Sequence, residues 1–209
     1  MRTSILAVLI LWVMGGCIYG VDPTTPEDQN DGNGTVLPTT YFNFTGNIHN
    51  VNYNMNPNSG YGYANVNSAI GLQNGNELLQ IGALFAEPGT NSSSLRIVFH
   101  KEVGPGGYTT AELYDLFSLE NKKFNFPGGI EPEGVHLEFV DENGELWATY
   151  LGSGDQEVSD VRVLARGEME GVDRVFYADI RFNCTVYNEL GSEMRISSAR
   201  WKGSFKATI

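Results

Sequence analysis

Apolar and polar residues alternate with a period of two along many short stretches of the chain. This alternation is typical of β-strands with one buried face, and glycine, asparagine and proline separate the stretches as turn residues do. The stretches that we expect to form strands are Tyr41–Ile48, Val51–Met55, Gly62–Asn67, Leu78–Phe85, Leu95–His100, Gly134–Val140, Leu146–Tyr150, Val158–Ala165, Arg174–Tyr187 and Met194–Lys206. No long segment has helical periodicity, so the pattern predicts an all-β fold.

The longest alternating stretch, Arg174–Tyr187, indicates how the sheet buries one face. Its even-numbered positions from 176 to 186 are apolar throughout and include Phe182 and Cys184. A similar apolar set near the C-terminus includes Trp201 and Phe205. Such alternation predicts antiparallel strands, arranged either as a β-sandwich or as a partly closed barrel. The pattern leaves these two arrangements open.

One short helix is expected at about Thr110–Leu119. Thr109 and Glu112 have the spacing of a capping box, in which each side chain bonds the backbone N–H of the other residue. The apolar residues that then fall on one helical face are Leu113, Leu116 and Phe117. We expect this helix to pack across an end or a face of the sheet.

The first 16 residues have the three parts of a secretory signal. Arg2 supplies a positive charge, an apolar core of ten residues follows at 5–14, and two glycines end the segment. Ten apolar residues are too few to cross a bilayer core of about 30 Å as a helix, so we expect no permanent transmembrane helix. The sequence MGGC at 14–17 resembles a bacterial lipobox, which predicts that Cys17 becomes a lipidated N-terminus.

Residues 17–38 are rich in Asp, Asn, Pro, Thr and Gly, and such a composition cannot build a core. We interpret this segment as a flexible acidic tether between a lipid anchor and a folded domain. The remaining residues, 39–209, are expected to form a single β domain. The predicted location is the outer membrane of a cell envelope, on its periplasmic or its surface side. An ordinary signal peptide that is cleaved and lost is the alternative to a lipid anchor.

The formal net charge of −12 opposes binding to nucleic acid and to anionic lipid surfaces. No basic stripe along the sequence overrides this charge. The closest approach to a basic cluster consists of Arg200, Lys202 and Lys206 near the C-terminus. We therefore expect no nucleic-acid partner.

Catalytic and metal-binding patterns are sparse. The three histidines have no paired spacing, and we expect His136 and Glu138 to lie on a polar outer strand face rather than to hold a metal. Cys184 lies within an apolar alternation, which predicts a small core residue instead of a reactive thiol. We expect no cofactor and no metal. Glutamate pairs such as Glu131 and Glu133 keep a carboxylate-dependent hydrolase open as an alternative.

Residues 47–76 contain an unusual run of asparagine and tyrosine. On a strand, alternation would place amides and phenols on one face, where they supply hydrogen-bonding groups and flat apolar rings. The residues that we take as a candidate ligand-binding surface are Asn50, Asn52, Asn54, Tyr61, Tyr63 and Asn65. The expected ligand is a glycan or a protein partner of the envelope. A solvated edge hairpin without a ligand is the alternative interpretation.

Four segments of the domain carry a resemblance to known proteins. They are GYTTAELYDL, LEFVDENGELWATYLGSG, ADIRFNCTVYNELG and ISSARWKGSF, which begin at Gly107, Leu137, Ala178 and Ile196. Together with the MGGC start and the tether, they resemble uncharacterised lipoproteins of Bacteroidota that carry a β-rich domain of unknown function. The resemblance implies a membrane-anchored β domain and assigns no catalytic residues. A structural accessory of an envelope complex is a further alternative.

Overall fold

The computed structural model describes residues 42–72, 75–89, 92–104, 109–119, 121–124, 133–151, 160–168 and 175–206. All of them belong to one compact unit within Gly32–Ile209. The signal segment 1–16, Cys17 and the tether 17–38 lie outside the described residues.

Strands make up most of the described chain. Their bounds are β1 (Asn43–Ile48), β2 (Val51–Met55), β3 (Gly62–Gly71), β4 (Glu77–Ala86), β5 (Ser94–Val103), β6 (Asn121–Lys122), β7 (Glu133–Val140), β8 (Leu146–Ala148), β9 (Asp160–Glu168), β10 (Val175–Tyr187) and β11 (Glu193–Lys206). One turn of 3₁₀ helix, η2 (Pro57–Ser59), follows β2, and helix α1 (Thr110–Leu116) follows β5. Each strand expected from the alternation is present, and the short β6 is the described strand that the alternation did not predict.

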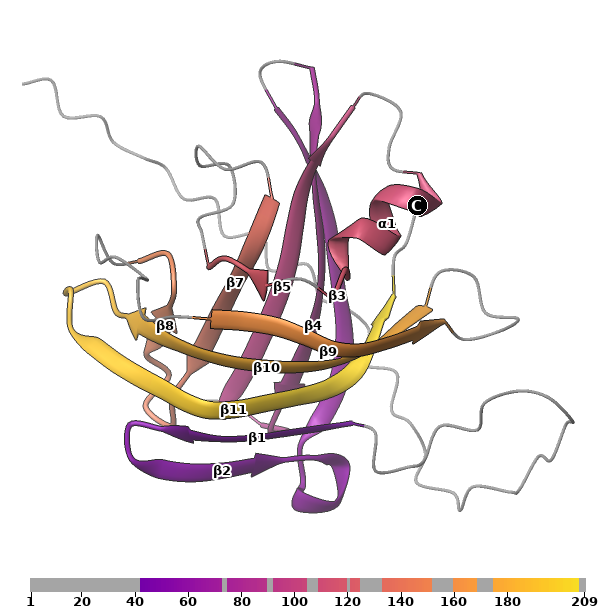
Figure 1. Ribbon diagram of the computed structural model, residues 1–209. Coiled ribbons are helices and arrows are strands. Elements are labelled where there is room, and N and C mark those ends of the chain that lie inside the picture. Colours follow the sequence, from indigo (N-terminus) through magenta and orange to yellow (C-terminus); the bar gives the residue numbers. More distant parts are fainter. Residues whose placement is uncertain are drawn as a thin grey trace, which may run out of the picture. The chain divides into compact units, whose positions relative to one another are not determined.

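Hydrogen bonding joins the strands into one sheet with the order β2-β1-β11-β10-β8-β7-β5-β4-β3, and β9 pairs with both β10 and β6. The pairings between these strands are antiparallel. The sheet curls on itself, so that β1, β2, β9, β10 and β11 run across β3, β4, β5 and β7 (Figure 1). This half-barrel confirms the predicted all-β fold with one short helix.

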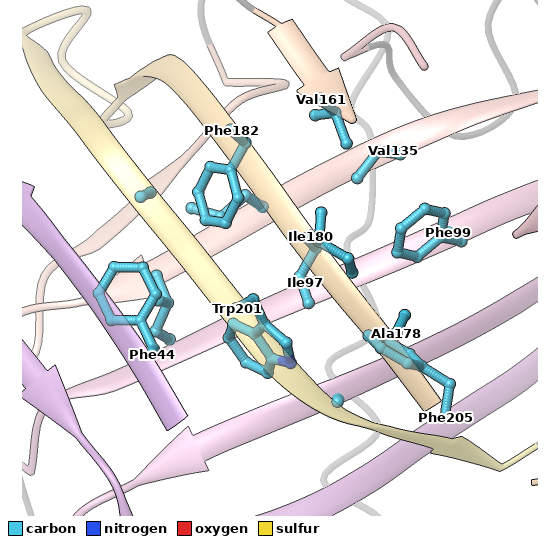
Figure 2. Packing of buried hydrophobic residues seen from close by; sticks show 14 of the residues in the cluster. Phe44, Ile97, Phe99, Val135, Val161, Ala178, Ile180, Phe182, Trp201 and Phe205 are labelled. Carbon is cyan, nitrogen blue, oxygen red and sulfur yellow. The ribbon is translucent and has the colours of Figure 1, made fainter. Parts of the chain in front are cut away.

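The core lies between the two halves of the curled sheet, and both halves contribute aromatic rings (Figure 2). Trp201 of β11 packs against Phe85 of β4 with ring centroids 4.7 Å apart, and Phe44 of β1 lies 6.3 Å from Trp201. All three side chains are fully buried. Cys184 is buried in the same core, and burial raises the pKa of its thiol. The prediction of an unreactive core cysteine at this position agrees with that burial.

Helix α1 begins with the predicted capping box. The Oγ1 of Thr109 accepts a hydrogen bond from the Glu112 N–H at 3.2 Å, and the Thr109 N–H donates to the Glu112 carboxylate at 2.6 Å. The buried ring of Phe117 follows the helix and lies 5.6 Å from Phe176 and 5.1 Å from Phe205. These two rings belong to the start of β10 and the end of β11, so α1 packs across one end of the sheet.

Side chains of β3 tie the edge of the sheet to β11. The Tyr63 hydroxyl donates to the Ser204 carbonyl, and the Lys206 N–H donates to the Asn65 Oδ1 at 3.0 Å. Gly203 leaves the space that the Tyr63 ring occupies, because a Cβ at this position would lie 2.3 Å from the phenol oxygen. The curled sheet is therefore held together on this side by side-chain bonds.

Candidate ligand-binding surface

The hairpin of β1 and β2 turns within two residues, His49 and Asn50. Their φ angles are 48° and 66°, the sign pattern of a type I′ turn. The Asn47 side chain supports the turn: its Oδ1 accepts from the Asn50 N–H at 2.8 Å, and its Nδ2 donates to the Asn52 Oδ1 at 3.3 Å. The turn thereby gathers three asparagine residues at one place on the hairpin.

A β-bulge in β11 lies beside this hairpin. Two residues, Ser197 and Ser198, occupy the interval that Asn183 alone spans on β10, and Ser198 has a φ of 51°. The Ser198 N–H donates to the Asn183 Oδ1 at 2.8 Å, so the side chain satisfies a backbone donor that the bulge removes from the ladder. On β1, Gly46 lies next to the bulge, and a Cβ there would come within 2.8 Å of the Phe44 ring. Glycine is therefore required at this close approach.

An open hollow of about 620 Å³ lies between the hairpin and the bulge. The residues that line it are Thr45, Gly46, Asn47, Asn50, Asn52, Tyr53, Ser197 and Ser198. Amides and hydroxyls make up most of this lining, so the hollow offers both hydrogen-bond donors and acceptors. The Tyr53 ring packs edge-on against Phe139 at 5.8 Å, and burial raises the pKa of its phenol, which stays neutral. The hollow is an uncharged, hydrogen-bonding site.

Three residues of the predicted Asn/Tyr surface belong to this hairpin. Asn50 and Asn52 line the hollow. Asn54 lies further along β2, where its Oδ1 accepts a hydrogen bond from the Asn56 Nδ2 at 2.9 Å. All three side chains are exposed. The structure therefore brings the asparagines of the first alternating run to one edge of the half-barrel.

The other three predicted residues lie in or beside β3, away from the hollow. The Tyr61 hydroxyl is 3.0 Å from the Ser93 Oγ, and its ring packs against the core. Tyr63 and Asn65 bond the backbone of β11, as described above. Their polar groups are thus used within the fold, and the structure does not join them to the asparagines of β2.

Several residues of the hollow were missed by the sequence analysis. Thr45, Ser197 and Ser198 line it, and the two serines form the bulge. One signal in the sequence marks them. The apolar alternation of β11 shifts by one residue between Ile196 and Ala199, which is what an extra residue in a strand produces.

A second polar cluster lies on β5 and β7, at the positions that alternate with the core residues. The Nδ1 atoms of His100 and His136 are 3.5 Å apart, and both rings are buried. Glu138 accepts a hydrogen bond from the Tyr150 hydroxyl at 2.8 Å and pairs with Arg96 at 3.0 Å. The predicted outer face is polar, but His136 is buried rather than solvated. Burial, together with the His100 ring and the Arg96 charge, lowers the pKa of His136 to about 3.

The described residues contain no group of three or more side chains placed to bind a metal ion. No helix in the described part of the chain has the length and apolar character that crossing a membrane requires. No family model, curated protein or solved structure matches the chain. The likeness to lipoproteins of Bacteroidota thus rests on sequence pattern alone.

Proposed function

We propose that this chain is a lipid-anchored binding module of the cell envelope whose ligand is a glycan, bound at the hollow between the β1–β2 hairpin and the bulge of β11. The observation that carries the proposal is the lining, in which uncharged amides and hydroxyls surround an open hollow. Sugars present hydroxyls that donate and accept hydrogen bonds, and the amides and hydroxyls of the lining offer partners for them.

Asn52 and Thr45 are the side chains best placed to contact this ligand. The Asn52 side chain is exposed, and its Oδ1 is held by Asn47. Its Nδ2 makes no hydrogen bond with any described residue, and the same holds for the Thr45 hydroxyl on the neighbouring strand. These two groups are available to a sugar hydroxyl without breaking a bond of the fold.

A carboxylate-dependent hydrolase has less support at this site. Hydrolysis of a glycosidic bond uses two carboxyl groups that flank the bond, and among the described residues no carboxylate lines the hollow. Glu133, one of the glutamates that the sequence singled out, pairs with Lys101 at 3.1 Å and also with Lys122. Its partner in the sequence pattern, Glu131, lies outside the described residues. These observations favour binding over hydrolysis.

A double variant, Thr45→Val with Asn52→Ala, tests the proposal on a glycan array. Valine keeps the branched shape of threonine on the strand, so Thr45→Val removes a hydroxyl without removing packing. Asn52→Ala removes an exposed amide and with it the acceptor of the Asn47 Nδ2. Loss of two hydrogen bonds should weaken binding of the array ligand about tenfold or more. Binding is measured with the full chain purified in detergent, and thermal unfolding checks that the variant is folded.

Asn58→Ala is the matched control, because Asn58 is an exposed asparagine of η2 in the same run and outside the hollow. It should bind as the wild type does. Undiminished binding by the double variant would place the ligand elsewhere. Failure of the wild-type chain to bind any glycan, with capture of an envelope protein in its place, would overturn the glycan proposal.

A further inference from the structure

Three arginines from different strands form a row on the outer face of the sheet. Arg181 of β10 lies directly opposite Arg162 of β9 and directly opposite Arg200 of β11 in the antiparallel register. Their neighbours along each strand belong to the buried core, so the arginines project to the other side. All three are exposed. The row therefore presents three guanidinium groups to a ligand.

The row continues the hollow. Arg200 lies directly opposite Thr45 of β1, and Thr45 lines the hollow. Thr45 pairs in turn with Asn54 of β2. Because neighbouring strands are about 4.8 Å apart, one track of polar groups crosses β2, β1, β11, β10 and β9, from Asn54 to Arg162.

The charges of the row are only partly compensated. Like charges directly opposite one another on neighbouring strands destabilise a sheet. Asp179 accepts hydrogen bonds from the Nε and Nη2 of Arg200 at 2.9 and 2.6 Å, and this pair raises the pKa of Arg200. Within the described part of the chain, Arg162 and Arg181 have no ion-pair partner. In a chain with a net charge of −12, this is a distinct local feature.

We propose that the glycan is acidic, and that Arg162, Arg181 and Arg200 bind its carboxylate or sulfate groups while the hollow binds its hydroxyls. This inference rests on the proposed function, because the row extends a track that begins at the hollow. A guanidinium donates two parallel hydrogen bonds to such an anion, which a lysine ammonium cannot do. Arg200 keeps its Nη1 donors for the ligand while Asp179 holds the rest of the group.

An acidic glycan suits this track better than nucleic acid or an anionic lipid surface does. One half of the track is uncharged and the other half carries the arginines, so a fitting ligand has both hydroxyls and spaced charges. Nucleic acid carries a charge at every phosphate. A membrane presents a broad anionic surface, which the net charge of −12 repels beyond the row.

Paired polymers that differ only in charge test the inference. The probes are polygalacturonate against its methyl ester, and dextran sulfate against dextran. The variant is Arg162→Gln with Arg181→Gln, which leaves the hollow and the Arg200–Asp179 pair intact. Arg166→Gln with Lys123→Gln is the charge-matched control, because both residues are exposed and neither belongs to the row. Calorimetry on the full chain measures affinity, and thermal unfolding confirms folding.

The wild-type chain should bind at least one acidic polymer about tenfold or more tightly than its neutral partner, with affinity that falls as salt is raised. The row variant should lose about tenfold or more on the acidic polymer and keep the affinity for the neutral one. The control should match the wild type. Because the variant removes like-charge repulsion, it should be folded and at least as stable as the wild type.

Four outcomes would overturn the inference. Equal affinity for acidic and neutral polymers, or undiminished acidic binding by the row variant, would refute it and leave the proposed function in place. Absence of binding to any polymer or array glycan would refute the proposed function itself. The arginines would instead bind a lipid or a nucleic acid if the chain bound phosphatidylglycerol vesicles or a single-stranded oligonucleotide in a row-dependent way and bound no glycan. The vesicle assay uses the full chain with Cys17→Ser.

Discussion

At the scale of single residues, Asn52 and Asn183 show how one side chain type serves two purposes. The amide of Asn183 is fully used by the fold, since its Oδ1 accepts from the Ser198 N–H and its Nδ2 donates to Asp160 at 2.7 Å. The amide of Asn52 accepts one bond from Asn47, and its Nδ2 donates to no described residue. Residue type alone does not distinguish the two, because the difference lies in which backbone groups come close.

His136 gives the fold a measurable dependence on pH. Its pKa in the folded protein is about 3, below its ordinary value of 6.5, so the unfolded chain binds the proton more tightly. The neutral ring stabilises the fold fully above about pH 6.5, and this stabilisation is lost as the pH falls toward 3. Between about pH 6.5 and 4, this histidine should lower the unfolding free energy of the wild type by up to about 3 kcal/mol. The His136→Gln variant should lack this part of the pH dependence. Urea unfolding at a series of pH values measures this.

His49→Asn is the control for this measurement. His49 is exposed in the β1–β2 turn, and asparagine tolerates the positive φ there. This variant should follow the pH dependence of the wild type. If His136→Gln also followed it, the buried ring would not be the source of the acid sensitivity.

At the scale of elements, the bulge of β11 and the join between β3 and β11 determine what the sheet can present. The bulge bends one strand beside the hairpin, and the hollow lies at that place. At the other end of β11, Tyr63 and Asn65 use their polar groups to hold β3. Two stretches that look alike in sequence thus become the hairpin that we propose binds the ligand and an edge strand whose polar groups hold the fold together.

Tyr63→Phe separates these two roles. The change removes the hydroxyl that donates to the Ser204 carbonyl and leaves that carbonyl without the bond, so the unfolding free energy should fall by about 1 kcal/mol. Glycan affinity should stay unchanged, because Tyr63 does not line the hollow. Chemical denaturation and the array assay measure the two effects.

Tyr61→Phe is the comparison for that variant, since its partly buried hydroxyl can exchange Ser93 for water and a smaller loss of stability is expected. If the Tyr63→Phe variant kept full stability but bound glycan more weakly, Tyr63 would contact the ligand, as the sequence pattern predicted.

At the scale of the whole molecule, the half-barrel places the proposed track on the outer side of five strands that come from two distant parts of the chain, β1–β2 and β9–β11. The core fills the space inside the curl with aromatic rings from both halves of the sheet (Figure 2). We therefore propose that ligand binds on the outer surface of these strands. A lipid anchor at Cys17, joined by the tether 17–38, would hold this surface near the membrane.

The anchor has its own test in the intact mass of the full chain extracted from membranes. Lipidation predicts a mass that lacks residues 1–16 and includes acyl chains on Cys17. The Cys17→Ser variant should stay in the aqueous fraction and bind the array glycan as the wild type does, because the hollow lies in the β domain. A mature chain without acyl mass would contradict the anchor and support an ordinary signal peptide.

Most of the fold could be predicted from sequence, but only two of the eight residues that line the hollow were predicted. Strand positions, the Thr109 capping box and the burial of Cys184 follow from local patterns, and the structure agrees with them. Asn50 and Asn52 were also found in this way. The hollow's serines and the role of Tyr63 were not, because they depend on the contacts of β11 with β1 and β10 and, across the curl, with β3.

The sequence by itself determined which residues form strands and, for strands such as β10 and β11, which side is buried, because a strand alternates its side chains and this needs no knowledge of its neighbours. Only the tertiary structure decided which strands lie side by side and in which register. Arg162, Arg181 and Arg200 are evenly spaced along the chain, yet they look like isolated charges until antiparallel pairing aligns them. The acidic-ligand proposal follows from that alignment, which hydrogen bonds between distant segments determine.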